Sequence, residues 1–308
     1  MSIKIISCHP VFNENALVLS QKYEWKIEKD FDPKANDLYI VFGAHEMAHQ
    51  LLEVQYRKNS SFGYIILNSE QIHSQFFKNK FYLKLMKQNV VCDYNAITPD
   101  WLKENDIKVF SYFYFEFMKF NVETKREYDV VFVGSANEKR TAIYNKLKET
   151  YPHLNIYFDL EWKHQSPEKL TDLLHKSKIV LNMPYYTNNA LETHRINKAL
   201  SCDCQVISLR SCDEDANTFY EDYVTFTDDI VSQVGKELEP KKTYEDLVKT
   251  LSQKINPHFL FVIDQVHKKL ISLSNVNESA REAVQEPTAT DSDISSNSET
   301  SLSMGDKV

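Results

Sequence analysis

Short apolar runs alternate along the chain with longer segments whose apolar residues recur at helical spacing. Strands are predicted at 3–7, 38–42, 64–67, 90–92 and 108–110, and again at 129–133, 155–158, 179–182, 205–208 and 223–226. Many of these runs are continuous and rich in β-branched residues, which is typical of parallel strands covered on both faces. Helices are predicted at 46–56, 69–79, 139–150, 167–176, 191–201 and 243–254. The alternation predicts an α/β fold with parallel sheets.

The strands fall into two sets, which predicts two Rossmann-like domains, 1–122 and 123–274. The segment 257–273 is predicted to be a helix packed back over them, because its apolar residues form one stripe. That stripe consists of Phe259, Val262, Ile263, Val266 and Leu270.

The C-terminal stretch 275–308 has a different composition and is predicted to be a disordered tail. It has no aromatic residue and is rich in Ser, Thr, Asp and Glu, so it buries too little apolar surface to fold. Residues 278–308 hold seven acids and two bases, which is most of the net charge of −8. The two domains are therefore close to neutral.

The acidic balance argues against a nucleic-acid partner. No apolar run is long enough for an integral membrane span. Five cysteines and an N-terminus without a signal-peptide pattern predict reduced thiols in the cytoplasm. Only five glycines are present, and neither a G-x-G-x-x-G fingerprint nor a P-loop occurs.

In open parallel sheets, ligands bind beyond the carboxyl ends of the strands. Polar residues follow these ends in both halves. They are Cys8, His9, His45, Glu46, Asn68, Ser69, Glu70, Asp93 and Tyr94 in the first half, and Ser135, Asn137, Glu161, Trp162 and Tyr185 to Asn189 in the second. Both rows would face one cleft if the domains meet at these ends.

The segment YDVVFVGSANEKR (128–140) is a strand, a polar turn and the start of a helix. Gly134 would let a phosphate approach the backbone, the helix N-terminus would supply N–H donors, and Arg140 would bind oxygens. An ordinary strand–helix turn that needs Gly for packing explains the pattern equally well. Further along the chain, Glu192 and Arg195 are three residues apart and share a helix face. They are either a structural ion pair, or Arg195 binds a diphosphate at the helix N-terminus.

The stretch from about 128 to 208 resembles the nucleotide-sugar-binding domain of group 1 glycosyltransferases of GT-B architecture, in the branch related to spore-maturation glycosyltransferases. FVGSANEKR (132–140), SKIVLN (177–182) and ETHRINKALSCDCQVIS (192–208) carry the resemblance. The family places a nucleotide-diphosphate sugar in the C-terminal domain and the acceptor against the N-terminal domain. The resemblance therefore implies a metal-independent glycosyltransferase without a cofactor, acting on a glycan or other hydroxyl acceptor. The expected donor-site residues are Gly134, Ser135, Arg140, Asn188, Asn189, Glu192 and Arg195.

The chain departs from the family pattern at Lys198, where relatives carry the Glu that commonly holds the donor ribose. Relatives also have Gly where this chain has Asp203, and Pro where it has Gln205. A lysine cannot accept hydrogen bonds from ribose hydroxyls. Either another acid such as Glu192 takes this role, or the donor is held differently, or the chain is a catalytically degenerate binding or scaffold protein.

An inverting enzyme needs a base for the acceptor hydroxyl. We expect His45 in this role, then Glu46, and after them His9 and Glu70, because each follows an N-terminal strand. A retaining enzyme would not need such a base, and the residues do not distinguish the two outcomes.

Two motifs suggest other chemistry. His45-Glu46-Met47-Ala48-His49 matches the zinc-protease pattern H-E-x-x-H, although the preceding strand ends only two residues earlier. Asp213-Glu214-Asp215 matches the metal-binding D-x-D pattern, for which an acidic surface turn is the alternative. The aromatic run 109–120 is either a buried strand or interdomain seam, or an aromatic wall for an acceptor.

Overall fold

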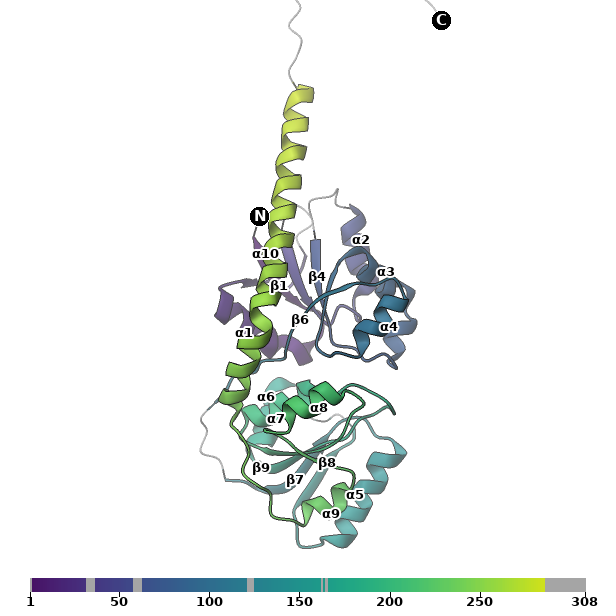
Figure 1. Ribbon diagram of the computed structural model, residues 1–308, viewed down its shortest axis with the longest axis vertical. Coiled ribbons are helices and arrows are strands. Elements are labelled where there is room, and N and C mark those ends of the chain that lie inside the picture. The colour runs from purple at the N-terminus through teal and green to yellow at the C-terminus, as the bar shows by residue number, and fades with distance from the viewer. Residues whose placement is uncertain are drawn as a thin grey trace, which may run out of the picture.

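The computed structural model describes residues 2–31, 37–57, 63–120, 125–161, 163 and 166–285. Trp162 and the part of the predicted tail from 286 to 308 lie outside the described residues. The described chain forms two α/β domains stacked one on the other, with a long C-terminal helix that runs along the N-terminal domain (Figure 1).

The N-terminal domain is built on a six-stranded sheet in the order β2-β1-β3-β4-β5-β6, and every neighbouring pair is parallel. Its strands are β1 (Ile3–Ser7), β2 (Lys26–Ile27), β3 (Leu38–Phe42), β4 (Gly63–Asn68), β5 (Val90–Asp93) and β6 (Val109–Tyr112). Its helices are η1 (Pro10–Phe12), α1 (Asn13–Tyr23), α2 (Ala48–Arg57), η2 (Gln75–Lys78), α3 (Lys80–Gln88) and α4 (Thr98–Glu104). All five residues of β3 are buried, as its continuous apolar sequence predicts for a central parallel strand.

The C-terminal domain has a five-stranded sheet in the order β11-β10-β9-β7-β8, again parallel throughout. Its strands are β7 (Tyr128–Val133), β8 (Ile156–Asp159), β9 (Ser177–Asn182), β10 (Gln205–Leu209) and β11 (Thr225–Thr227). Its helices are α5 (Glu138–Thr150), α6 (Pro167–His175), α7 (Thr193–Ser201), α8 (Glu214–Tyr220) and α9 (Ile230–Val234). Ser166 caps α6 by accepting from the Lys169 N–H, with Pro167 in the first turn. The predicted α/β fold with two parallel sheets is confirmed.

Several predicted elements differ from the structure. The predicted helix 69–79 is wrong, because residues 69–74 form a loop and the helix α3 begins only at Lys80. Asn79 caps α3 by accepting from the N–H groups of Phe81 and Tyr82, which fixes this later start. The helices α1, α4, α8 and α9 were not predicted.

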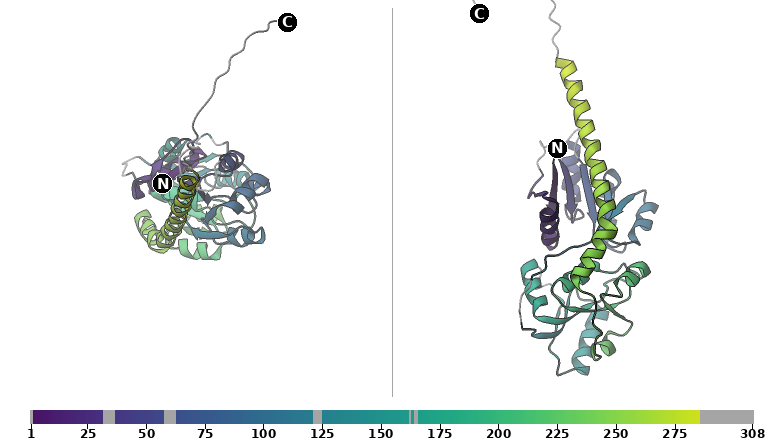
Figure 2. Two further views of the ribbon diagram at one scale, coloured as in Figure 1. Left: turned by 90° about the horizontal axis from the view of Figure 1, so that it is seen from above. Right: turned by 60° about the vertical axis from the view of Figure 1, so that its left-hand side comes forward.

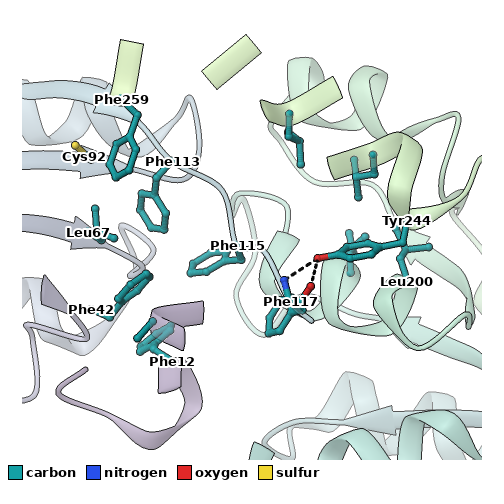
Figure 3. Packing of buried hydrophobic residues seen from close by; sticks show 14 of the residues in the cluster. Phe12, Phe42, Leu67, Cys92, Phe113, Phe115, Phe117, Leu200, Tyr244 and Phe259 are labelled. Atoms are coloured by element: carbon teal, nitrogen blue, oxygen red, sulfur yellow. Dashed lines mark hydrogen bonds between the residues drawn. The ribbon is translucent and has the colours of Figure 1, made fainter. Parts of the chain in front are cut away.

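The aromatic run forms the seam between the domains. After β6, the chain continues extended, and Phe113, Phe115 and Phe117 are buried in one cluster with residues of both domains. Figure 3 shows Phe115 between the N-terminal aromatic residues and Phe117. The Phe117 backbone N–H donates to the Tyr244 hydroxyl at 2.7 Å, and this hydroxyl donates to the Phe117 carbonyl at 3.1 Å. The interdomain-seam interpretation of 109–120 is therefore confirmed.

One helix, α10 (Tyr244–Gln285), replaces the two predicted at 243–254 and 257–273 and continues through Pro257. It leaves the C-terminal domain and projects past the N-terminal domain, as the second view in Figure 2 also shows. Residues 275–285, which the sequence assigned to the tail, are helical. The predicted apolar stripe packs as expected, with Phe259 and Ile263 in the interdomain cluster and Leu270 against Gly63.

The five cysteines are unpaired, and Cys92, Cys202 and Cys204 are buried as small core residues. Among the helices within the described ranges, none combines the length and the apolarity needed to cross a membrane.

Candidate functional site: an interdomain cleft with two arginines

A cavity of about 580 Å³ lies between the two domains. Ser69 and Glu70 follow β4, Tyr94 follows β5, and Ser135 follows β7, so the cavity opens at the carboxyl ends of both sheets. This is where an open parallel sheet presents loop side chains and helix N-termini to a ligand. The two rows of strand-end residues thus meet in one cleft, although not every predicted residue reaches it.

Arg140 enters the wall of the cleft from the first turn of α5. Asn137 caps this helix, since its side chain accepts from the Arg140 N–H at 2.8 Å. The guanidinium turns inward, with only 2% of the residue exposed, and donates to the carbonyl oxygens of Ser135 and Met183. Its Nε has no hydrogen-bond partner among the described residues. Backbone carbonyls hold the group in place but leave its charge largely uncompensated.

Arg195 approaches the same wall from the first turn of α7. It donates to the Asn182 side chain at 2.8 Å and to the Val133 carbonyl at 3.2 Å. It also pairs with Glu192, the residue directly before α7. The spacing of three residues predicted this pair.

Glu192 stands between the two arginines. Its second carboxylate oxygen lies 3.7 Å from Arg140 Nη2. Both guanidinium groups lie over the Phe132 ring, with their central carbons 4.8 Å (Arg140) and 5.2 Å (Arg195) from the ring centroid. Burial, followed by the charge of Arg195, lowers the pKa of Arg140 to about 10. Arg140 therefore stays protonated at neutral pH. Two positive charges facing one negative charge leave this wall suited to an anion.

Gly134 has a different role from the one its sequence position suggested. It does not line the cavity. A Cβ at this position would lie 2.9 Å from the Phe132 ring and 3.2 Å from Arg195 Nη2. The absence of a side chain thus makes room for the Arg195 guanidinium.

Of the other predicted donor-site residues, Ser135 lines the cavity and the two asparagines do not. Asn188 has a left-handed backbone, with φ of 56°, and its carbonyl lies 3.2 Å from His73 Nε2 across the domain boundary. Asn189 is buried, and its carbonyl accepts from the Cys212 N–H. Both asparagines shape the loop, while Tyr185 and Tyr186 of the same loop face the cavity.

The predicted base His45 and its neighbour Glu46 are also absent from the cavity lining. His45 is buried behind Glu70, with Nε2 3.3 Å from a Glu70 carboxylate oxygen and 3.6 Å from Glu46. Burial lowers the pKa of His45 to about 4, so the ring is neutral at neutral pH. Glu70, ranked behind both from the sequence, is the acid that reaches the N-terminal wall.

The sequence missed the part of this wall that comes from the misassigned helix 69–79. Gln71, Ser74, Gln75 and Phe76 line the cavity from the loop after β4 and from η2. The search for polar residues directly after strands identified Ser69 and Glu70, but it does not extend to residues further along the loop. No shorter-range signal marks Phe76 as a cleft residue.

Lys198 is not part of the cavity lining. It is 2% exposed on α7 and pairs at 2.5 Å with Glu14 of α1, which is 8% exposed. The pair joins the two domains. The residue that departs from the glycosyltransferase pattern is therefore explained by a contact with the N-terminal domain.

The two rival motifs are also explained by contacts. His45 and Glu46 lie in the turn before α2, whereas His49 is in the helix and contacts the Phe81 ring, so the two histidines do not share a helical face. Within the described ranges, no group of three or more His, Cys, Asp or Glu could hold a metal ion. Asp213 caps α8 and accepts from the Ala96 N–H of the other domain at 3.3 Å.

No family model matches this chain, and no curated protein sequence matches it. Solved structures similar to the chain include Anabaena HepE in complex with UDP, at 8% identity and a TM-score of 0.40, covering 92% of this chain and 99% of that one. They also include AviGT4, a glycosyltransferase involved in avilamycin A biosynthesis, at 9% identity and a TM-score of 0.49, covering 88% of this chain and 98% of that one. Likenesses this distant do not transfer a function or a residue role.

Proposed function

We propose that this protein is a glycosyltransferase that binds a nucleotide-diphosphate sugar against the C-terminal wall of the cleft and moves the sugar to an acceptor hydroxyl. The observation that carries the proposal is the pair formed by the buried Arg140 and the partly buried Arg195, which face a single carboxylate beside the cavity. A diphosphate supplies the anionic oxygens that this wall lacks. The resemblance of residues 128–208 to nucleotide-sugar-binding domains supports the same ligand class.

The reaction that fits this wall needs no metal ion. When a glycosyl carbon leaves a nucleoside diphosphate, negative charge grows on the departing phosphate oxygens. Guanidinium groups and a helix N-terminus stabilise that charge without a divalent cation. Arg195 lies in the first turn of α7, whose N-terminus carries no side-chain cap, so helix and side chain would act on the same oxygens.

A thermal-shift screen of nucleotide-diphosphate sugars tests the class of protein and identifies the donor in one experiment. Isothermal titration calorimetry with the free nucleoside diphosphate then tests the site. We expect Arg195→Ala to weaken binding roughly tenfold to 150-fold, the loss of one or two hydrogen bonds to a charged group. Arg210→Ala is the control, because Arg210 pairs with Glu221 outside the cavity lining.

Unchanged affinity in Arg195→Ala, with the far-ultraviolet circular dichroism spectrum of the wild type, would contradict the donor site. Nucleotide-sugar binding without hydrolysis or transfer would favour the scaffold alternative that Lys198 raised. In the structure Lys198 contacts Glu14 rather than the cleft, so its presence alone does not argue for lost activity.

A further inference from the structure

The outward side of α3 combines lysines with an exposed aromatic ring. The buried side of this helix consists of Tyr82, Leu85 and Met86. The exposed side consists of Lys80, Phe81, Lys84, Lys87 and Gln88. At 3.6 residues per turn these two sets lie on opposite sides, so the helix is amphipathic. Every charged residue on its exposed side is a lysine.

The neighbouring helix α2 extends this surface, and Figure 1 shows the two helices side by side in the N-terminal domain. The rings of His49 and Phe81 meet edge to face, with their centroids 4.8 Å apart. Lys84 Nζ lies 5.0 Å from the Tyr56 ring centroid, and the Gln88 side chain donates to the Tyr56 hydroxyl at 3.4 Å. Together with the lysine that precedes α3 by two residues, these side chains form one surface. We call it the lysine face and define it by Tyr56, Lys78, Lys80, Phe81, Lys84 and Lys87.

Few acids compensate the lysines of this face. Lys87 lies 3.9 Å from Asp106, and Glu53, an exposed acid of α2, pairs with Arg57. Within the described ranges, ion pairs are absent at three of the four lysines, which are Lys78, Lys80 and Lys84. The lysine face therefore carries an excess of positive charge, although the chain as a whole has a net charge of −8.

The two aromatic rings of the face are largely open to solvent. Phe81 is 49% exposed and Tyr56 is 60% exposed. Removing an apolar ring from water is favourable, so a partner that covers these rings gains free energy. Lysine side chains can reach anionic groups with their ammonium ends while their methylene stems remain in an apolar layer. A lipid surface offers both an apolar layer for the rings and phosphates for the lysines.

We propose that the lysine face binds a membrane surface that contains anionic lipids. The helix α3 would lie parallel to that surface, with Phe81 at the boundary between headgroups and acyl chains. Charges elsewhere on the chain, more than a Debye length of roughly 10 Å away, are largely screened. The rival polyanion is a single-stranded nucleic acid, which binds by stacking its bases on open rings, whereas Lys84 already covers one side of the Tyr56 ring.

This inference goes beyond the proposed function and does not depend on it. The residues that define the lysine face are absent from the cavity lining. Binding of a nucleotide in the cleft and binding of a membrane at this face can therefore be measured, and can fail, independently.

Vesicle sedimentation with the full-length protein tests the proposal. The vesicles consist of phosphatidylcholine alone, or of equal parts of phosphatidylcholine and phosphatidylglycerol. We expect the protein to bind only the anionic vesicles at about 0.1 M salt and to be released at about 1 M salt, because the Debye length falls from roughly 10 Å to roughly 3 Å. Equal binding to both kinds of vesicle, or binding to neither at the lower salt concentration, would overturn the proposal.

Variants of the face test which residues are responsible. Lys80→Gln/Lys84→Gln should lower the partition coefficient for anionic vesicles roughly 25-fold, because each lysine near an anionic membrane contributes roughly fivefold. Phe81→Ala should lower it roughly threefold to tenfold, the effect of burying about half of a phenylalanine side chain. Wild-type partitioning of the double lysine variant would contradict the assignment of this face.

The matched control is Lys146→Gln/Lys148→Gln, which removes the same charge from α5 in the C-terminal domain. Both lysines are exposed, and Lys148 lies over the ring of Tyr144, so the local setting resembles that of the lysine face. The control should sediment with anionic vesicles as the wild type does. A loss as large as that of the double lysine variant would mean that net charge alone, and not this face, determines binding.

Phe81→Trp distinguishes lipid from nucleic acid. Its fluorescence is compared with that of the wild type, which already has three tryptophans. We expect the additional emission to shift to shorter wavelength with anionic vesicles and not with a single-stranded oligonucleotide. If the oligonucleotide binds through the lysines and anionic vesicles do not bind, the face is a nucleic-acid site and the lipid proposal is wrong.

Discussion

The buried ion pair between Lys198 and Glu14 gives the sharpest test of how the two domains are held together. The perturbation is Lys198→Met, which keeps most of the side-chain volume and removes the charge. In the wild type, Lys198 Nζ lies 2.5 Å from Glu14 and 5.2 Å from the Phe117 ring centroid. Glu14 also accepts from the Met118 N–H at 3.1 Å.

In Lys198→Met, the Met118 N–H is the one hydrogen-bond donor among the described residues that remains to Glu14, a residue only 8% exposed. Breaking a buried pair by removing one partner costs about 3–5 kcal/mol, because the other charge stays buried without compensation. For a domain of 150–250 residues, each kcal/mol lowers the melting temperature by roughly 2–4 °C. The variant should therefore melt roughly 6–20 °C below the wild type.

The assay is thermal unfolding followed by circular dichroism near neutral pH, with calorimetry of nucleotide binding on the folded protein. The double variant Glu14→Gln/Lys198→Met removes both charges and should recover most of the loss, since replacing a buried pair by neutral groups is often neutral. Lys242→Met is the control, because Lys242 and Asp222 form an exposed pair and such pairs contribute little.

Two results would refute this reasoning. The first is a melting temperature of Lys198→Met within about 2 °C of the wild type, which would correspond to a loss of less than about 1 kcal/mol in a domain of this size. The second is a double variant that is no more stable than Lys198→Met. Nucleotide affinity should stay unchanged, because Lys198 is outside the cavity lining. A stable variant with lost nucleotide affinity would instead assign Lys198 to the donor site.

Two further predictions concern residues around the cleft. Gly134→Ala should weaken nucleoside-diphosphate binding without unfolding the protein, because the added Cβ would press on the Phe132 ring and the Arg195 guanidinium; calorimetry measures this, and wild-type affinity would contradict it. His194→Gln should make the free energy of unfolding fall less steeply as the pH is lowered. Burial, then the charges of Arg195 and Lys198, lower the pKa of His194 to about 3. Between that value and the ordinary 6.5, the unfolded chain binds a proton that the folded chain does not, so stability falls as the pH falls. The difference between wild type and variant should change by roughly 1.4 kcal/mol per pH unit over this window, measured as urea unfolding from pH 4 to 6. Parallel curves would contradict it.

The sequence by itself determined the local elements of this protein and much of its cleft. Continuous β-branched runs gave two parallel sheets, because a strand that is buried on both faces needs apolar residues on both. Position after a strand then identified Ser69, Glu70, Tyr94 and Ser135, since parallel strands bring their carboxyl ends to one edge. The three-residue spacing of Glu192 and Arg195 predicted their pair, which depends only on helix geometry.

Local patterns were misleading where packing or capping decides. No helix spans 69–79; the helix α3 begins at Lys80, where Asn79 caps it. The loop before α3 places Gln71 in the cleft. The gap expected between the helices 243–254 and 257–273 is absent, because the apolar stripe of α10 packs against both domains. Tertiary burial of such a stripe outweighs the lost hydrogen bond at proline.

Only the tertiary structure decided which of the candidate groups meet. His45 follows its strand as predicted, yet it does not reach the cavity, because it is buried beside Glu70, which does. Position after a strand does not tell which of two neighbouring side chains is exposed to the cleft. Lys198 finds Glu14 across 184 residues of sequence, a contact that no periodicity encodes. The spacing of residues close in sequence determines the strands and helices of each domain. Which side chains line the cleft depends instead on how the two domain surfaces pack together, and no local spacing encodes that.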